Sequence, residues 1–200
     1  YRMMTSRAEY RLLLRQDNAD LRLTPIGHEI GLISDERYKN FIHKKELIKQ
    51  EIDRMKSTTI KPTSKVNEFL SKHGTSTISN GIKLADLLKR SELTYENLDE
   101  IDENRPNLAK EVQDEVEIQI KYEGYIKLQE DQVEKFKKLE QKMLPKDLEY
   151  SEIKGLRLEA RQKLNKVKPN SVGQASRISG VSPADISVLL IYLEQIKNNK

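Results

Sequence analysis

The sequence contains no cysteine and no tryptophan, and aromatic residues make up only 6% of it. Without cysteine there are no disulfides, no thiolate metal ligands and no thiol nucleophile. No apolar stretch approaches the length of a membrane span, and no secretory signal peptide opens the chain. The lack of cysteine is compatible with the cytoplasm, which is the location we expect.

The motifs of cofactor binding and catalysis are missing too. The eight glycines are scattered, so there is no G-x-G-x-x-G turn, Walker loop or nucleophile elbow. His28, His43 and His73 are isolated from one another and lack the spacing of metal ligands. The sequence alone therefore predicts no catalytic residue, no cofactor-binding residue and no metal site.

The ratio of apolar to charged residues predicts the fold class. Hydrophobic residues make up 36% and charged residues 34%, which is typical of long solvated helices with narrow apolar stripes. We expect a mainly α protein, an extended multi-helix domain with a long central helix and a small C-terminal three-helix subdomain. Long helices are expected over about 34–56 and 108–143. Residues 116–122 also alternate like a strand, but helical spacing fits them as well and no turn signal flanks them.

Shorter helices are expected from capping residues and prolines. One helix, capped by Thr5 and Ser6, should end near Arg15, before a break at 18–20. Thr24-Pro25 is then expected to open a second short helix. Further short helices are predicted at about 82–90, 94–101, 158–167, 172–179 and 183–196.

We expect three segments, 1–33, 34–146 and 147–200. Within the second, residues 57–91 are expected to form a variable lobe, since 57–80 are rich in Ser, Thr and Gly. Because the first residue, Tyr1, stands inside dense, patterned sequence, we interpret the chain as a fragment of a longer protein.

Positive charge gathers towards both ends of the chain. Residues 1–23 carry a net +2, residues 154–177 a net +6 and residues 24–153 a net −4. Contacts with a polyanion should therefore lie at the ends. The alternatives are a solvated face paired with nearby carboxylates for the N-terminal arginines, and a solubilising surface for the C-terminal cations. The candidate cations are Arg7, Arg11, Arg15, Arg22, Lys154, Arg157, Arg161, Lys163, Lys166, Lys168 and Arg177.

Two further features carry alternatives. Residues 174–187 are similar to the turn of a helix-turn-helix DNA reader, which needs polar and basic side chains on its second helix. That helix is apolar here, and we expect it to bury itself against the domain or a protein partner. Tyr122 and Tyr125 could stack on unpaired bases, although core or interface anchoring is preferred. The candidate partner-binding residues are Ile186, Leu189, Leu190 and Leu193.

Several blocks resemble one family in the correct order. They are residues 1–24, with Thr5-Ser6-Arg7-Ala8-Glu9-Tyr10-Arg11 and Asp17-Asn18-Ala19-Asp20, then residues 116–126, Gly155-Leu156 and residues 173–186. Together they resemble the C-terminal part of the MnmG family, also called GidA, whose members modify the wobble uridine of tRNA. The resemblance covers nearly the whole chain except about 57–91. Met4 and Glu149 depart from its pattern.

The resemblance implies a full-length homodimeric enzyme that uses FAD, NADH and methylene-tetrahydrofolate. With a GTPase partner, MnmE, such an enzyme forms the carboxymethylaminomethyl group on C5 of the wobble uridine. Residues 1–33 would then join a missing flavin domain, and the helical region would hold tRNA and meet the GTPase. By itself the chain is expected to be non-catalytic and to bind no cofactor. A pure protein-interaction module that docks the GTPase is the alternative, and a helix-turn-helix DNA binder is a remote one.

Overall fold

The structure, a computed structural model, describes residues 9–198, and the side chains of residues 9–197. The chain divides into two compact units, and the boundary between them in the sequence falls between Gln129 and Glu130. We call them the first unit and the second unit. The secondary structure is mainly helical, which confirms the predicted fold class. The division into segments 1–33, 34–146 and 147–200 stays a prediction.

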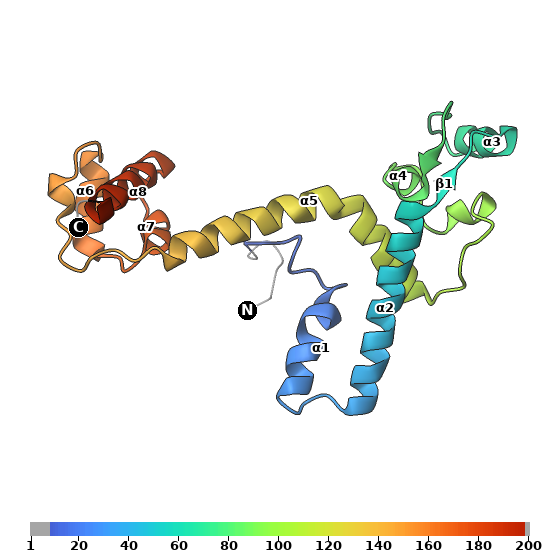
Figure 1. Cartoon of the computed structure of the whole chain (residues 1–200), viewed down its shortest axis with the longest axis horizontal. Coiled ribbons are helices and arrows are strands. Elements are labelled where there is room, and N and C mark those ends of the chain that lie inside the picture. The colour runs from blue at the N-terminus through green and yellow to red at the C-terminus, as the bar shows by residue number, and fades with distance from the viewer. Residues whose placement is uncertain (1–8, 199–200) are drawn as a thin grey trace. The chain divides into compact units, whose positions relative to one another are not determined.

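The first unit begins with a helical hairpin (Figure 1). Helix α1 (Ala19–Glu29) packs along helix α2 (Asp35–Ser57), and Gly31 in the turn between them has a φ of 79°. The Ser34 side chain caps α2 by accepting a hydrogen bond from the Arg37 amide. The long helix predicted over 34–56 is therefore confirmed.

The remaining elements of the first unit cover the C-terminal end of α2 (Figure 1). They are β1 (Thr59–Ile60), α3 (Ser64–Lys72), β2 (Ile82–Lys83), α4 (Leu84–Leu88), the 3-10 helix η2 (Asn97–Glu100) and the start of α5 (Lys110–Gln141). Strands β1 and β2 are antiparallel, with Ile60 opposite Ile82. The segment 57–91 contributes the fully buried Leu70 and Leu84 to the core. Residues 116–122 lie within α5, as predicted.

A buried ionic cluster ties α2 to the chain that follows η2. The Arg54 guanidinium donates to Asp102 at 2.6 Å and to Glu51 at 2.7 Å, and both carboxylates are buried. The Tyr95 hydroxyl donates to Glu51 at 2.8 Å, and burial together with this carboxylate raises the pKa of Tyr95. One guanidinium thus bridges two carboxylates inside the core.

The second unit contains the end of α5 and a small helical bundle. Its elements are the 3-10 helix η3 (Tyr150–Glu152), α6 (Leu158–Val167), α7 (Val172–Ser176) and α8 (Pro183–Asn198). These three α-helices confirm the predicted subdomain. Its core is formed by apolar side chains from all of these elements, among them Tyr150, Ala160, Leu164, Val172 and Leu189.

Asp185 organises the start of α8. Its carboxylate, 1% exposed, accepts hydrogen bonds from the Ser182 amide at 2.9 Å and from the Ser182 hydroxyl at 2.7 Å. The Arg157 guanidinium donates to the same carboxylate at 2.7 Å. Asp185 therefore caps α8 and links it to the residue before α6.

The predictions for the N-terminal helices are wrong where the structure describes them. Residues 9–14 form turns, and α1 begins at Ala19, where a break was expected. Asn18 lies just before α1, and its side chain makes no capping hydrogen bond to the helix. Its amide nitrogen donates to the Leu13 carbonyl at 3.1 Å and its oxygen accepts from the Arg22 side chain at 2.9 Å, so Asn18 links the preceding turn to α1. Pro25 lies inside α1, where packing on α2 compensates for the donor that proline lacks. Thr5 and Ser6 lie outside the described residues.

Candidate nucleic-acid interface

The excess positive charge of the chain lies in the second unit. Residues 130–200 carry 14 Lys and Arg against 10 Asp and Glu, an excess equal to the +4 of the whole chain. Residues 1–129 carry 22 of each and are neutral. A polyanion is therefore attracted to the second unit by net charge, while the first unit offers only local cationic spots.

Three exposed lysines on or beside α6 are available for phosphate. Lys163 and Lys166 lie three residues apart on α6, whose inner face is fixed in the core by Ala160 and Leu164. Lys154 lies in the turn before α6 and is also exposed. Within residues 9–198, no carboxylate forms an ion pair with these three lysines within 4.0 Å. We call Lys154, Lys163 and Lys166 the lysine patch.

Three of the other predicted cations of the second unit are engaged in ion pairs within its own structure. Arg157 pairs with Asp185 at 2.7 Å, Lys168 pairs with Glu149 at 3.0 Å, and Arg177 pairs with Glu140. The hydrogen bond from Arg177 lowers the pKa of Glu140. Arg161 is only half-exposed. The three ion-paired residues therefore contribute less free charge than the sequence suggests.

The predicted N-terminal arginine stripe is not observed where the structure describes it. Arg15 is mostly buried and pairs with Asp17 at 2.9 Å and with Glu115 of α5 at 3.5 Å. Arg22 donates to the Arg15 carbonyl at 3.2 Å. Because residues 9–14 form turns, Arg11 is exposed but does not share a helical face with Arg15. Arg7 lies outside the described residues. Arg15 and Arg22 thus hold the N-terminal segment together and against α5.

The predicted partner face of α8 needs correction. Ile186 and Leu189 are buried in the core of the second unit, and Leu190 and Leu193 are half-buried against that core. The helix therefore buries its apolar side within its own unit. The exposed side of α8 instead presents Ile191.

The exposed side of α8 also bears on the DNA-binding alternative. Among its described residues, the exposed positions are Pro183, Ala184, Ser187, Ile191, Glu194, Gln195 and Lys197. Reading base edges in a major groove requires several polar or basic side chains near the start of the helix. Its first turns provide small and apolar side chains, so nothing in the geometry favours DNA.

Tyr122 and Tyr125 are exposed on α5, so they do not anchor the core, and anchoring at an interface stays a prediction. Nearby Glu123 forms ion pairs with Lys56 at 2.5 Å and Lys89 at 3.3 Å, and the Lys56 hydrogen bond lowers its pKa. Lys121 likewise pairs with Glu117 at 3.0 Å. Part of the positive charge beside these tyrosines is therefore engaged in ion pairs within the first unit.

Metal binding and membrane spanning can be examined over all the described residues. In the described part of the chain, no group of three or more His, Asp or Glu side chains is arranged to hold a metal ion. None of the described helices is long and apolar enough to cross a membrane.

The fold and the charge distribution define a pair of helical modules, one neutral and one with a cationic face. Comparison with known families identifies them. Residues 35–130 match the family described as "tRNA modifying enzyme MnmG/GidA C-terminal helical domain". Residues 132–200 match "tRNA modifying enzyme MnmG/GidA C-terminal helical bundle". The chain belongs to the MnmG/GidA family, as the ordered sequence blocks predicted.

Individual relatives agree with this assignment. The chain is 65% identical over 197 residues to the tRNA uridine 5-carboxymethylaminomethyl modification enzyme MnmG of Caldicellulosiruptor saccharolyticus, covering 98% of this chain and 32% of that protein. It is 62% identical to the MnmG of Lachnoclostridium phytofermentans, covering 100% of this chain and 32% of the relative. The solved structure of Aquifex aeolicus GidA in the form II crystal is 40% identical, with a TM-score of 0.66, over 96% of this chain and 30% of that one. The chain thus spans about a third of the length of these relatives.

Proposed function

We propose that the chain is the tRNA- and partner-binding C-terminal region of an FAD-dependent enzyme that modifies C5 of the wobble uridine of tRNA. The observation that carries this proposal is the concentration of the whole excess charge in the second unit, where Lys154, Lys163 and Lys166 are exposed and form no ion pair with the described residues. Exposed lysines that neutralise phosphates release counterions from RNA, which drives binding.

The residues present do not fit the flavin itself. A dinucleotide is held where a strand runs through a glycine-rich turn into a helix. The strands in the described residues are two residues long, and Gly31, Gly74, Gly155 and Gly180, which have positive φ, lie outside any such turn. FAD, NADH and methylene-tetrahydrofolate are therefore assigned to the rest of the full-length protein, and no chemical step is assigned to this chain. A GTPase partner (MnmE), a homodimer and a cytoplasmic location belong to the same proposal.

Neutralising the lysine patch should weaken tRNA binding. For the triple variant Lys154→Gln, Lys163→Gln, Lys166→Gln we expect roughly a hundredfold lower affinity at about 0.1 M salt, because each lost phosphate contact removes about one unit from the slope of log K against log salt. The measurement is fluorescence anisotropy with labelled tRNA over a series of salt concentrations.

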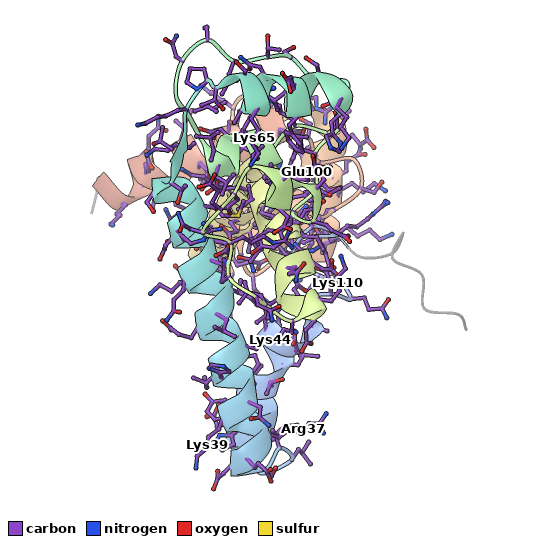
Figure 2. All side chains as sticks on the ribbon, turned by 90° about the vertical axis from the view of Figure 1, so that its right-hand side faces the viewer. Arg37, Lys39, Lys44, Lys65, Glu100 and Lys110 are labelled. Carbon is purple, nitrogen blue, oxygen red and sulfur yellow. The ribbon has the colours of Figure 1, made fainter. Side chains whose placement is uncertain are left out.

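A matched control removes three exposed lysines from the neutral first unit. The control is Lys39→Gln, Lys61→Gln, Lys65→Gln, and Figure 2 shows Lys39 near the beginning of α2 and Lys65 at the other end of this unit, on α3. Its salt slope should stay close to that of the parent chain. Equal losses in the two triple variants would refute the lysine patch as the tRNA contact and leave only non-specific attraction.

A protein-interaction role is supported by a different observation. Leu158 and Ile191 of the second unit are 70% and 58% exposed, which is unusual for large apolar side chains of a small bundle. Leu158→Ser with Ile191→Ser should weaken binding of the GTPase at least tenfold in titration calorimetry and leave tRNA affinity unchanged. Deleting α8 is not a usable test, since Leu189 is core. Unchanged GTPase affinity in the folded double variant would remove these residues from the docking surface.

A further inference from the structure

Helix α1 is apolar on two opposite sides, and the described residues of its own unit cover only one of them. On the inner side, Leu21 packs against the core of the first unit and the His28 ring stacks on Tyr38 of α2 at 4.0 Å. The inner edge is also held by an ion pair at 2.8 Å between Asp20 and Lys44, a residue that Figure 2 labels on α2. These contacts fix which face of α1 points towards α2.

The opposite face carries a second apolar stripe. Leu23, Ile26 and Ile30 are 56%, 54% and 63% exposed, and the half-buried Ala19 continues the stripe at the start of the helix. The intervals between these four positions are four, three and four residues. With about 3.6 residues per turn, this spacing places all four on one side of the helix, opposite Leu21 and His28. We call Ala19, Leu23, Ile26 and Ile30 the outer seam.

The spacing and exposure of the outer seam indicate what it binds. Alternating intervals of three and four are those of the a and d positions by which one α-helix packs on another. A helix that is apolar on two opposite sides is normally enclosed between two layers. Since α1 has no fully buried residue, residues 9–198 do not supply this second layer.

We propose that the outer seam is the docking surface for an α-helix of the polypeptide that precedes this region in the full-length protein. The relatives are about three times longer, and both matching family segments are C-terminal, so in the relatives the additional polypeptide lies before this region. Polypeptide joined covalently to residue 1 lies within 18 residues of α1, which gives it a high effective concentration there.

A second copy of the chain fits the outer seam less well. Four side chains over three turns offer far less than the roughly 800 Å² per partner of a stable interface between free chains. The same small surface is sufficient when its partner is tethered, because association then needs no loss of free translation. This inference rests on the family assignment and is independent of tRNA binding.

Cysteine labelling tests the proposal directly, because this chain has no cysteine of its own. Leu23→Cys, Ile26→Cys and Ile30→Cys would be introduced singly into the 200-residue chain and into the full-length protein. Reaction with a maleimide would be followed by peptide mass mapping. We expect labelling at these positions to be at least tenfold slower in the full-length protein. Glu29→Cys, exposed on the same helix but away from the seam, is the matched control and should change little.

Three outcomes would overturn the proposal. Equal labelling rates in the two proteins would show that the seam stays open. Slower labelling of the 200-residue chain as its concentration rises would identify a second copy as the occupant. A photo-crosslinker at Ile26 should form adducts with the preceding polypeptide of the full-length protein. Adducts only with tRNA or with the GTPase would also contradict the proposal.

Discussion

Replacement of Arg54 by methionine is expected to lower the free energy of unfolding of the chain by about 3–5 kcal/mol. Arg54 is the shared partner of two buried carboxylates, Glu51 and Asp102, at 2.7 Å and 2.6 Å. Without it, two negative charges stay in the core without a cation, and Tyr95 alone still donates to one of them. Urea unfolding followed by circular dichroism would measure the loss.

Two comparisons separate this effect from the general loss of a surface charge. Lys56→Met removes an exposed ion pair with Glu123 and should cost less than about 1 kcal/mol. Adding Glu51→Gln to Arg54→Met should restore part of the stability, because one uncompensated charge is removed. If Arg54→Met and Lys56→Met destabilised the chain equally, the cluster would have no special role in the core.

Asp185→Ala should destabilise the second unit by about 2–4 kcal/mol. The substitution leaves the Ser182 amide without its acceptor and removes the partner of Arg157. Hydrogen exchange of the α8 amides is the appropriate measurement, since it reports on this unit separately. Asp185→Asn keeps an acceptor for the cap and should lose less. Equal protection of α8 in the parent and in Asp185→Ala would refute the capping role.

The contribution of Asp185 should also depend on pH in a defined direction. The Arg157 guanidinium, helped by Ser182, holds the pKa of the Asp185 carboxyl well below its usual range. The stabilisation is therefore complete above the unfolded-state pKa of about 3.9 and is lost as the pH falls through the lower folded-state value. The stability difference between the parent chain and Asp185→Asn should accordingly shrink as the pH falls below about 4.

Local signals in the sequence predicted most of the helices. A serine cap precedes α2, the apolar period persists through α5, and the bounds of α6 agree with those expected from the sequence. The N-terminus was different, because Asn18 is both a typical helix breaker and a good start for a helix. The contacts of Asn18 with Leu13 and Arg22 accompany its place at the start of α1. These contacts depend on how the turn before α1 folds, which the local sequence does not reveal.

The candidate interface could be predicted only as a set of cations. Which of them remain free depends on partners that are distant in sequence. Arg157 meets Asp185 28 residues later, and Arg177 meets Glu140 37 residues earlier. Likewise, the apolar period of α8 showed that one face is buried, but not that its own bundle buries it. Net charge is additive along a sequence, whereas pairing and burial depend on the tertiary fold.

The charge neutrality of the first unit makes ionic strength a means of separating two attachments. Moderate salt, which shortens the screening length, should release RNA from the second unit first. An apolar helix contact on α1 would persist under the same conditions, and salting-out anions would strengthen it. One titration of a complete assembly should therefore dissociate the nucleic acid while the polypeptide contacts stay in place.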